Sequence, residues 1–195
     1  SNFLYEIGYN KGGTFWDRFV VRVAPAENNL PYREASRINI HRDTWGTNLY
    51  QQINWWAPVS NVEEKNTMIF YPDYFDVPVK NTTSTWDLNI YLANRKKGDF
   101  SYPSAPQLKE DLPSNIKKIP VTIKPGEILC FSGAHLHSSS KEKSENTRIS
   151  FEIRTICEND LNSSAQAPNV DCDLQWKFPK IFKKINDNSP LKITS

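Results

Sequence analysis

Short runs of β-branched and aromatic residues, separated by Pro, Gly and Asn, recur along most of this chain. The clearest runs are residues 19–23, 37–41, 50–56, 66–71, 121–123, 127–131 and 148–155. Such runs predict β-strands, and many short strands with Pro and Gly turns are typical of a sandwich, a barrel or a jelly roll. Helical periodicity is weak, and the segments that fit a helix best are 85–95 and 178–185. We therefore expect an all-β fold with a few peripheral helices.

The length and charge of the chain limit its domain organisation and partners. Its 195 residues suffice for one domain with a substantial core. The 24 basic and 22 acidic residues leave a formal net charge of +2, without the basic surplus typical of nucleic-acid-binding domains. No apolar run approaches the roughly 18 residues of a membrane span, and the first residues lack a signal-peptide pattern. We expect a domain over residues 1–160, an extension over 161–195 that packs on it, and neither a nucleic-acid nor a membrane partner.

The chain has three cysteines, Cys130, Cys157 and Cys172. Their odd number and the absence of a Cys-x-x-Cys spacing argue against a disulfide framework. Thiols that stay reduced are typical of the cytosol. The cysteines therefore predict a cytoplasmic protein.

All three histidines fall in two short motifs, His41-Arg42-Asp43 and His135-Leu136-His137. Side chains two residues apart on a strand point to the same side, so we expect His41 and Asp43 to share a face and Arg42 to point away. Two histidines and one carboxylate, with open coordination positions, form the ligand set of non-haem Fe(II) oxygenases. The sequence therefore predicts a metal site made by His41, Asp43 and one histidine of the second motif.

His137 is the better third ligand. Gly133 follows the strand predicted at 127–132 and indicates a bend, and His137 lies beyond that bend. The serines at 138–140 are expected to support its imidazole by hydrogen bonds of the kind that fix the tautomer of a ligand. His135 would then support the site or face the substrate.

Arg148 and Ser150 lie on a strand that alternates strictly between polar and apolar residues, 11 residues after His137. One interpretation is a half-exposed strand whose charged face lies in water. The other places the polar face inside the barrel, where the planar guanidinium of Arg148 binds a carboxylate with two hydrogen bonds and Ser150 adds a hydroxyl. The position of Arg148 relative to His137 favours the second interpretation.

Together these features resemble the phytanoyl-CoA dioxygenase family of Fe(II)- and 2-oxoglutarate-dependent oxygenases. The resemblance extends over residues 37–156, about two-thirds of the chain. Its matching features are His41-Arg42-Asp43, the strand and turn at 66–72, Pro125-Gly126-Glu127 before Phe131, His137, and Arg148 with Ser150.

The resemblance implies a double-stranded β-helix, the jelly roll of cupin-like proteins, with iron at its open end. His41, Asp43 and His137 would bind Fe(II), and the far carboxylate of 2-oxoglutarate would bind Arg148 and Ser150. The implied reaction uses molecular oxygen and couples oxidative decarboxylation of 2-oxoglutarate to succinate with hydroxylation of a small organic substrate. Asp43 argues against a halogenating variant, which needs that coordination position for halide. The substrate and the oligomeric state stay open.

Two other interpretations remain. His135, His137 and Glu142 have the His-x-His-x4-Glu spacing of a cupin metal motif, although its glycines are absent and no histidine follows to complete a set of four ligands. Alternatively, the chain is a jelly-roll binding domain without catalytic activity, since such folds also serve as lectin and capsid domains. The complete set of two histidines, one carboxylate and one arginine argues against that second alternative.

Overall fold

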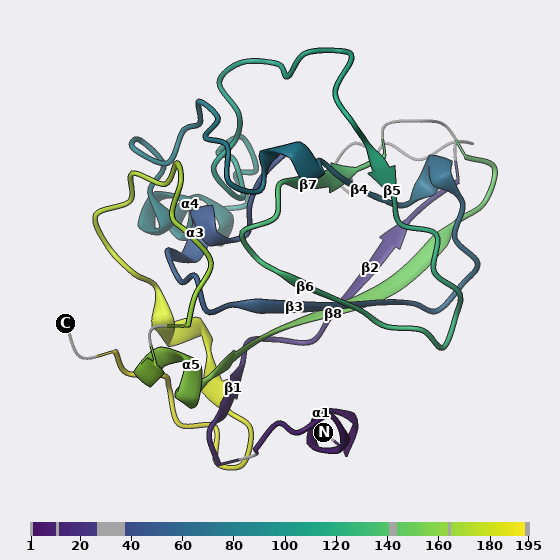
Figure 1. Ribbon diagram of the computed structural model, residues 1–195. Helices are drawn as coiled ribbons and strands as arrows, with labels where there is room; N and C mark the ends of the chain where they lie inside the picture. Colours follow the sequence, from purple (N-terminus) through teal and green to yellow (C-terminus); the bar gives the residue numbers. More distant parts are fainter. Residues whose placement is uncertain (1, 11, 27–37, 141–143, 164, 194–195) are drawn as a thin grey trace.

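The computed structural model describes residues 2–10, 12–26, 38–140, 144–163 and 165–193. Its strands form two antiparallel sheets, one of six strands and one of three, and Figure 1 shows the smaller sheet lying over the larger. The helices in these residues are few and short. The sequence predicted an all-β fold with a few peripheral helices, and the structure confirms antiparallel sheets with few helices.

The strand β8 (Arg148–Cys157) is the backbone of the larger sheet. Along one edge it pairs with β3 (Ile53–Pro58), and along the other with β1 (Thr14–Trp16) and β2 (Val20–Ala24) in succession. The order β6-β3-β8-β1-β9 is completed by two outer strands, β6 (Leu129–Ser132) and β9 (Lys183–Lys184). The strands predicted at 19–23, 50–56, 127–131 and 148–155 are confirmed, with ends that differ by up to three residues.

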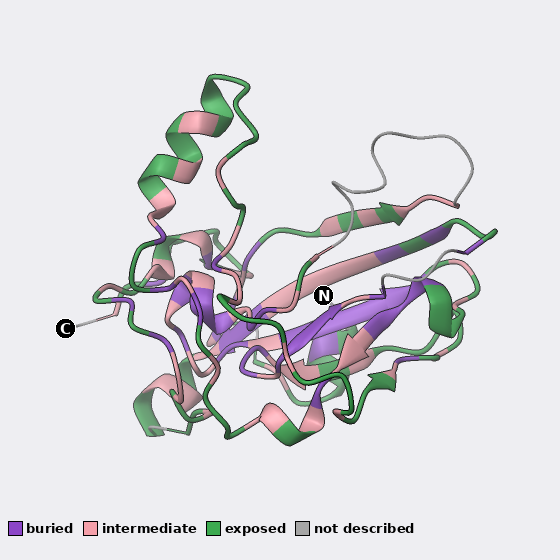
Figure 2. Ribbon diagram, turned by 90° about the horizontal axis from the view of Figure 1, so that it is seen from above, coloured by how far each residue is buried: buried purple, intermediate pink, exposed green. Residues whose placement is uncertain are grey.

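The smaller sheet has the order β5-β4-β7, with β5 (Ile119–Pro120), β4 (Met68–Phe70) and β7 (His137–Ser139). It packs against the larger sheet through a buried cluster in which Trp56 of β3 contacts Met68 and Val121. Burying a large apolar side chain contributes about 1.5–3 kcal/mol, so this cluster holds the two sheets face to face. Figure 2 shows the buried residues concentrated along the strands of the two sheets.

Short helices and 3₁₀ turns lie outside the sheets. They are α1 (Asn2–Glu6), α3 (Thr44–Thr47), α4 (Leu88–Lys96), α5 (Glu158–Ser163), η1 (Glu64–Asn66), η2 (Pro72–Tyr74) and η3 (Pro179–Ile181). Helix α4 has no buried residue and stands away from the sheets in Figure 2. It begins where the side chain of Asp87 accepts hydrogen bonds from the backbone N–H groups of Asn89 and Ile90. The helix predicted at 85–95 is thus confirmed, although it starts three residues later.

Two predicted strands are wrong in part or in full. In place of the strand predicted at 37–41 there is a single bridge between His41 and His137, and Arg37 lies outside the described residues. Residues 121–123 form no strand. The Val121 N–H still donates to the carbonyl of Met68, but Met68 is the first residue of β4, so the residues after Val121 have no β4 residue opposite them. Without a neighbouring backbone to bond, β-branched residues do not continue a strand.

The helix predicted at 178–185 is also wrong. The chain instead forms the 3₁₀ turn η3 and then the strand β9, which pairs with β1 at the edge of the larger sheet. Between them Phe182 is fully buried with Phe15, Ile156 and Leu191. Pairing at an open sheet edge outweighed the helical pattern. Residues after 160 therefore contribute to both the sheet and the core, and the division at residue 160 stays a prediction.

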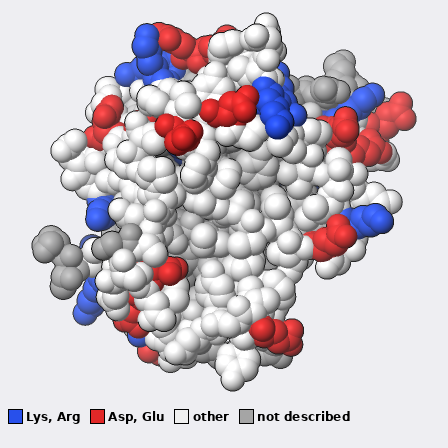
Figure 3. All heavy atoms as spheres, in the orientation of Figure 1, with Lys and Arg blue, Asp and Glu red and all other residues white. Residues whose placement is uncertain are grey.

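The described residues contain no helix that is long and apolar enough to cross a membrane. On the face drawn in Figure 3, acidic and basic side chains lie interspersed around the rim, and the centre is largely uncharged. This distribution agrees with the nearly balanced charge of the sequence.

Candidate functional site

The two histidines of the predicted metal site meet through their backbones. His41 and His137 form an antiparallel bridge in which each N–H donates to the carbonyl of the other, at 2.9 and 3.0 Å. Residues that face each other across such a bridge project their side chains to the same side. The imidazole centroids consequently lie 4.3 Å apart.

Asp43 reaches the same point from the start of α3. Its carboxylate oxygens lie 3.6 Å from Nε2 of His41 and 3.7 Å from Nε2 of His137. One ligand atom from each of the three residues lies within 4.8 Å of the others, and together they form a cluster that can hold a metal ion. This cluster has the donor set of a non-haem Fe(II) site. The structure thus brings together the three residues that the sequence singled out.

Backbone carbonyls orient both imidazoles. Nδ1 of His41 lies 2.8 Å from the carbonyl of Asn39, and Nδ1 of His137 lies 2.9 Å from the carbonyl of His135. Because a carbonyl only accepts, each Nδ1 carries a proton, and each Nε2 faces the Asp43 carboxylate at the point where a metal ion would bind. Of the serines expected to support His137, Ser138 bonds the Tyr71 hydroxyl instead, at 2.9 Å, and Ser139 accepts from the Ile38 N–H at 3.1 Å. Support of His137 by Ser140 stays a prediction.

The protonation states in this cluster suit metal binding. Burial, aided by the neighbouring His41, lowers the pKa of His137 to about 4, although Asp43 opposes the shift. Burial disfavours the charged Asp43 carboxylate, but its interactions with His41, His137 and Arg154 outweigh burial and hold its pKa below the ordinary value. A neutral imidazole and an ionised carboxylate are the forms that bind a divalent cation.

Asn54 on β3 is a residue of the site that the sequence prediction missed. Its side-chain amide donates to Oδ2 of Asp43, and the residue is 5% exposed. The available signal was its place on the strand, because Asn is depleted in strands and Asn54 lies on the same face as the inward-facing Trp56.

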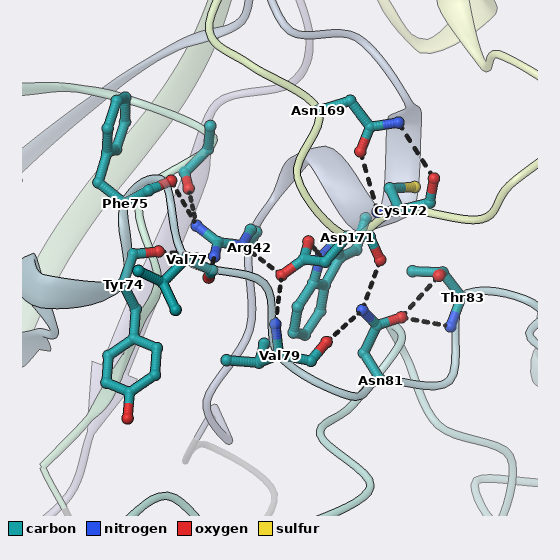
Figure 4. Close-up of polar contacts among 12 residues, drawn as sticks. Arg42, Tyr74, Phe75, Val77, Val79, Asn81, Thr83, Asn169, Asp171 and Cys172 are labelled. Atoms are coloured by element: carbon teal, nitrogen blue, oxygen red, sulfur yellow. Dashed lines mark hydrogen bonds and ion pairs between the residues drawn. The ribbon is translucent and has the colours of Figure 1, made fainter.

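Arg42, between the two predicted ligands, points away from the metal cluster as expected, and Figure 4 shows what it binds. Its guanidinium donates to the carboxylate of Asp171 at 3.1 Å and to the backbone carbonyls of Tyr74, Phe75, Val77 and Ala134. Asp171 also accepts from the Trp45 indole at 2.7 Å and from the Val79 N–H at 3.1 Å. This buried pair ties the segment that carries the ligands to the C-terminal part of the chain.

Replacing Asp171 with Asn is expected to lower the free energy of unfolding by about 3–5 kcal/mol, because it leaves the buried Arg42 without its counter-charge. The two side chains are 2% and 4% exposed. Urea denaturation measures the change. The matched control is Glu110→Gln, which removes the carboxylate of the exposed Lys80–Glu110 pair and should cost at most about 1 kcal/mol. Equal effects of the two substitutions would contradict the structural role of Asp171.

His135 lies outside the metal cluster. Its ring packs against Phe70, Phe75 and Phe131, with centroids 5.6, 4.6 and 6.4 Å away, and its Nδ1 lies 3.1 Å from the carbonyl of Ser132. The alternative cupin set also requires Glu142, which lies outside the described residues. Within the described residues, the metal-binding cluster contains His137 and not His135.

The polar face of β8 lies inside the protein. Arg148 is 3% exposed and Ser150 is fully buried, whereas Ile149 between them is 37% exposed. This burial pattern contradicts a strand with its charged face in water. Nε of Arg148 and Oγ of Ser150 are both buried without a hydrogen-bond partner among the residues that the structure describes. Such orphaned donors are rare in folded proteins and mark a place where a ligand can bind.

Arg22 adds a third donor to this anion site. It lies opposite Ser150 in the pairing of β2 with β8, one of its Nη atoms pairs with Glu152, and its buried Nε likewise lacks a partner among the described residues. Burial, with a smaller contribution from Arg22, lowers the pKa of Arg148 to about 10, which still leaves it charged at neutral pH. The guanidinium of Arg148 also lies over the Trp56 ring, 5.4 Å from its centroid. The buried Arg148 and Ser150, together with the buried Nε of the partly exposed Arg22, thus form a site suited to a carboxylate.

Comparisons with known proteins find similarity in fold and not in sequence. No protein-family model matches the chain, and no curated protein matches it. The structure of EvdO2 from Micromonospora carbonacea var. aurantiaca complexed with 2-oxoglutarate gives a TM-score of 0.51 at 10% identity, over 84% of this chain and 59% of that one. A further structure of EvdO2 gives 0.50 at 9% identity, over 86% and 56%.

The apo structure of ThoJ, a non-heme monooxygenase, gives a TM-score of 0.49 at 13% identity, over 75% of this chain and 47% of that one. The chain thus spans about half the length of the solved structures that it matches. At these identities, the similarity to EvdO2 establishes a shared fold.

Proposed function

We propose that this chain is an Fe(II)- and 2-oxoglutarate-dependent dioxygenase that hydroxylates a small organic substrate. The observation that carries the proposal is the convergence of His41, Asp43 and His137, whose ligand atoms lie within 4.8 Å of one another. We further propose that the two sheets form a double-stranded β-helix of the phytanoyl-CoA dioxygenase-like kind. The similarity in fold to EvdO2, which was solved with 2-oxoglutarate, supports this proposal.

The residues fit the iron that this function requires. Both Nε2 atoms are available because both Nδ1 atoms are held by carbonyls, and the Asp43 carboxylate is ionised. Bound Fe(II) would supply the site that activates molecular oxygen as 2-oxoglutarate is oxidatively decarboxylated to succinate. The protein holds the ligands in place, orients the co-substrate and keeps the site buried.

The anion site provides the second part of the proposal. Arg148, Ser150 and Arg22 offer buried donors that a carboxylate of 2-oxoglutarate would satisfy. A charged hydrogen bond inside a protein is stronger than one in water, so these donors would fix one end of the co-substrate. The other end would be free to bind the metal.

We also propose a cytoplasmic location. Cys130, Cys157 and Cys172 are all free thiols, which supports a reducing compartment. The primary substrate is proposed only as a small organic molecule.

The test is isothermal titration of 2-oxoglutarate into the protein with and without Mn(II), which replaces Fe(II) without reacting with oxygen. We expect binding to be at least about tenfold tighter with the metal, because the keto acid gains metal coordination in addition to its bond to Arg148. Glutarate, which lacks the keto oxygen, is the control and should show little dependence on Mn(II). Equal affinity for 2-oxoglutarate with and without metal would refute the proposed function.

A further inference from the structure

A chain of buried side-chain hydrogen bonds ends at the Asp43 carboxylate. The Thr47 hydroxyl donates to Oε1 of Gln52 at 3.2 Å, and Nε2 of Gln52 donates to Oδ1 of Asn54 at 2.9 Å. Nδ2 of Asn54 then donates to Oδ2 of Asp43. Thr47, Gln52 and Asn54 are 2%, 0% and 5% exposed, so water does not compete strongly for these groups.

The direction of this chain follows from the charge at its end. An ionised carboxylate only accepts hydrogen bonds, so Asn54 must turn its NH₂ group toward Asp43 and its oxygen toward Gln52. Gln52 must then offer its own NH₂ to Asn54, which leaves its oxygen for the Thr47 hydroxyl. Each amide therefore has one satisfied orientation, and the reverse orientation of Asn54 would place its oxygen against the carboxylate.

Gly133 leaves the space that Gln52 occupies. A Cβ added at Gly133 would lie 2.7 Å from Nε2 of Gln52, closer than real Cβ atoms approach. The backbone fixes the same place, because the Gly133 N–H donates to the carbonyl of Gln52 and its carbonyl accepts from the Thr44 N–H, next to Asp43. The glycine that the sequence marks as a bend thus also admits the side chain that orients Asn54.

We infer that Asn54, held by Gln52 and Thr47, is a positioning residue that fixes the orientation of the Asp43 carboxylate toward the metal. It does so by donating to Oδ2, the oxygen that also lies 3.7 Å from Nε2 of His137. This inference rests on the metal site of the proposed function. Asn54 contacts the ligand and not the metal, so it acts through Asp43. Groups that hold a metal ligand by hydrogen bonds typically affect metal affinity by about 10–100-fold when they are removed.

The experiment is an anaerobic titration of Co(II) into metal-free protein, followed by its visible spectrum, which reports affinity and coordination geometry without catalysis. Asn54→Leu keeps the approximate shape of the side chain but cannot donate, and it should weaken Co(II) binding by about 10–100-fold and change the spectrum. The matched control is Gln51→Leu, which removes a neighbouring amide whose partner is the exposed Gln166. It should leave the Co(II) affinity and the visible spectrum unchanged.

A second variant covers the case in which Asn54→Leu does not fold. Gln52→Met removes the donor that orients Asn54 and keeps the contact between Asn54 and Asp43, so it should weaken Co(II) binding by a smaller factor, about 3–10-fold. Wild-type affinity and spectrum in whichever of these variants folds would overturn the inference. If the wild-type protein binds no Co(II), the proposed metal site fails instead, so the two failures are distinguishable.

Discussion

Asp43→Ala is expected to abolish Fe(II) binding while leaving the fold largely intact. The substitution removes the only carboxylate of the metal-binding cluster in the described residues and leaves two histidines, which hold a divalent cation weakly. The fold should persist because the Asp43 side chain makes no capping hydrogen bond to helix α3. The main structural cost is the unpaired amide of Asn54, about 1–3 kcal/mol.

Anaerobic equilibrium dialysis with Fe(II), together with urea denaturation of the metal-free protein, measures both parts of this prediction. Asp73→Ala is the control, because Asp73 is an exposed carboxylate in η2 and should leave iron binding unchanged. Retention of stoichiometric Fe(II) by the Asp43 variant would show that the metal binds elsewhere.

Arg148→Gln is expected to raise the concentration of 2-oxoglutarate needed for half-saturation by about 30-fold to several thousand-fold. A buried carboxylate that loses its charged partner loses about 2–5 kcal/mol, and each 1.4 kcal/mol corresponds to tenfold in affinity. Gln retains hydrogen-bond donors but removes the charge. Fe(II) affinity in the absence of 2-oxoglutarate should not change, because Arg148 is not part of the metal-binding cluster.

Titration of 2-oxoglutarate into the metal-loaded variant measures this effect, and Arg95→Gln on the exposed helix α4 is the control. An unchanged half-saturation concentration would place the carboxylate at another cation. Arg154 is the other arginine of β8, but its Nε already bonds the carboxylate of Asp17 at 2.6 Å.

The spacing of a few polar residues was sufficient to predict the candidate site. His41 and Asp43 lie two residues apart, and the convergence of both with His137 was predicted correctly although 96 residues separate the two histidines. The local structure expected to bring these side chains together, a strand ending at His41, was wrong. The side chains meet because of one bridge and the start of a short helix, and not because His41 ends a strand. Whether the three residues bind iron stays a prediction.

The supporting residues could not be predicted because their roles depend on contacts between distant segments. Asn54 reaches Asp43 from the larger sheet, and Arg42 finds Asp171 near the other end of the chain. Arg22 becomes part of the anion site only through the register of β2 against β8. The helix predicted at 178–185 failed for a similar reason, since its amphipathic pattern also suits a buried Phe182 next to a strand at a sheet edge.

The most direct test of the proposed metal centre is anaerobic addition of Fe(II) and 2-oxoglutarate to the metal-free protein, followed by the weak visible charge-transfer band of the chelate. The same titration is made on His135→Ala and His137→Ala. The wild-type protein and His135→Ala should show the band, and His137→Ala should not. No band in the wild-type protein, with metal bound in a manner that depends on His135, would contradict the account and favour a cupin-type site.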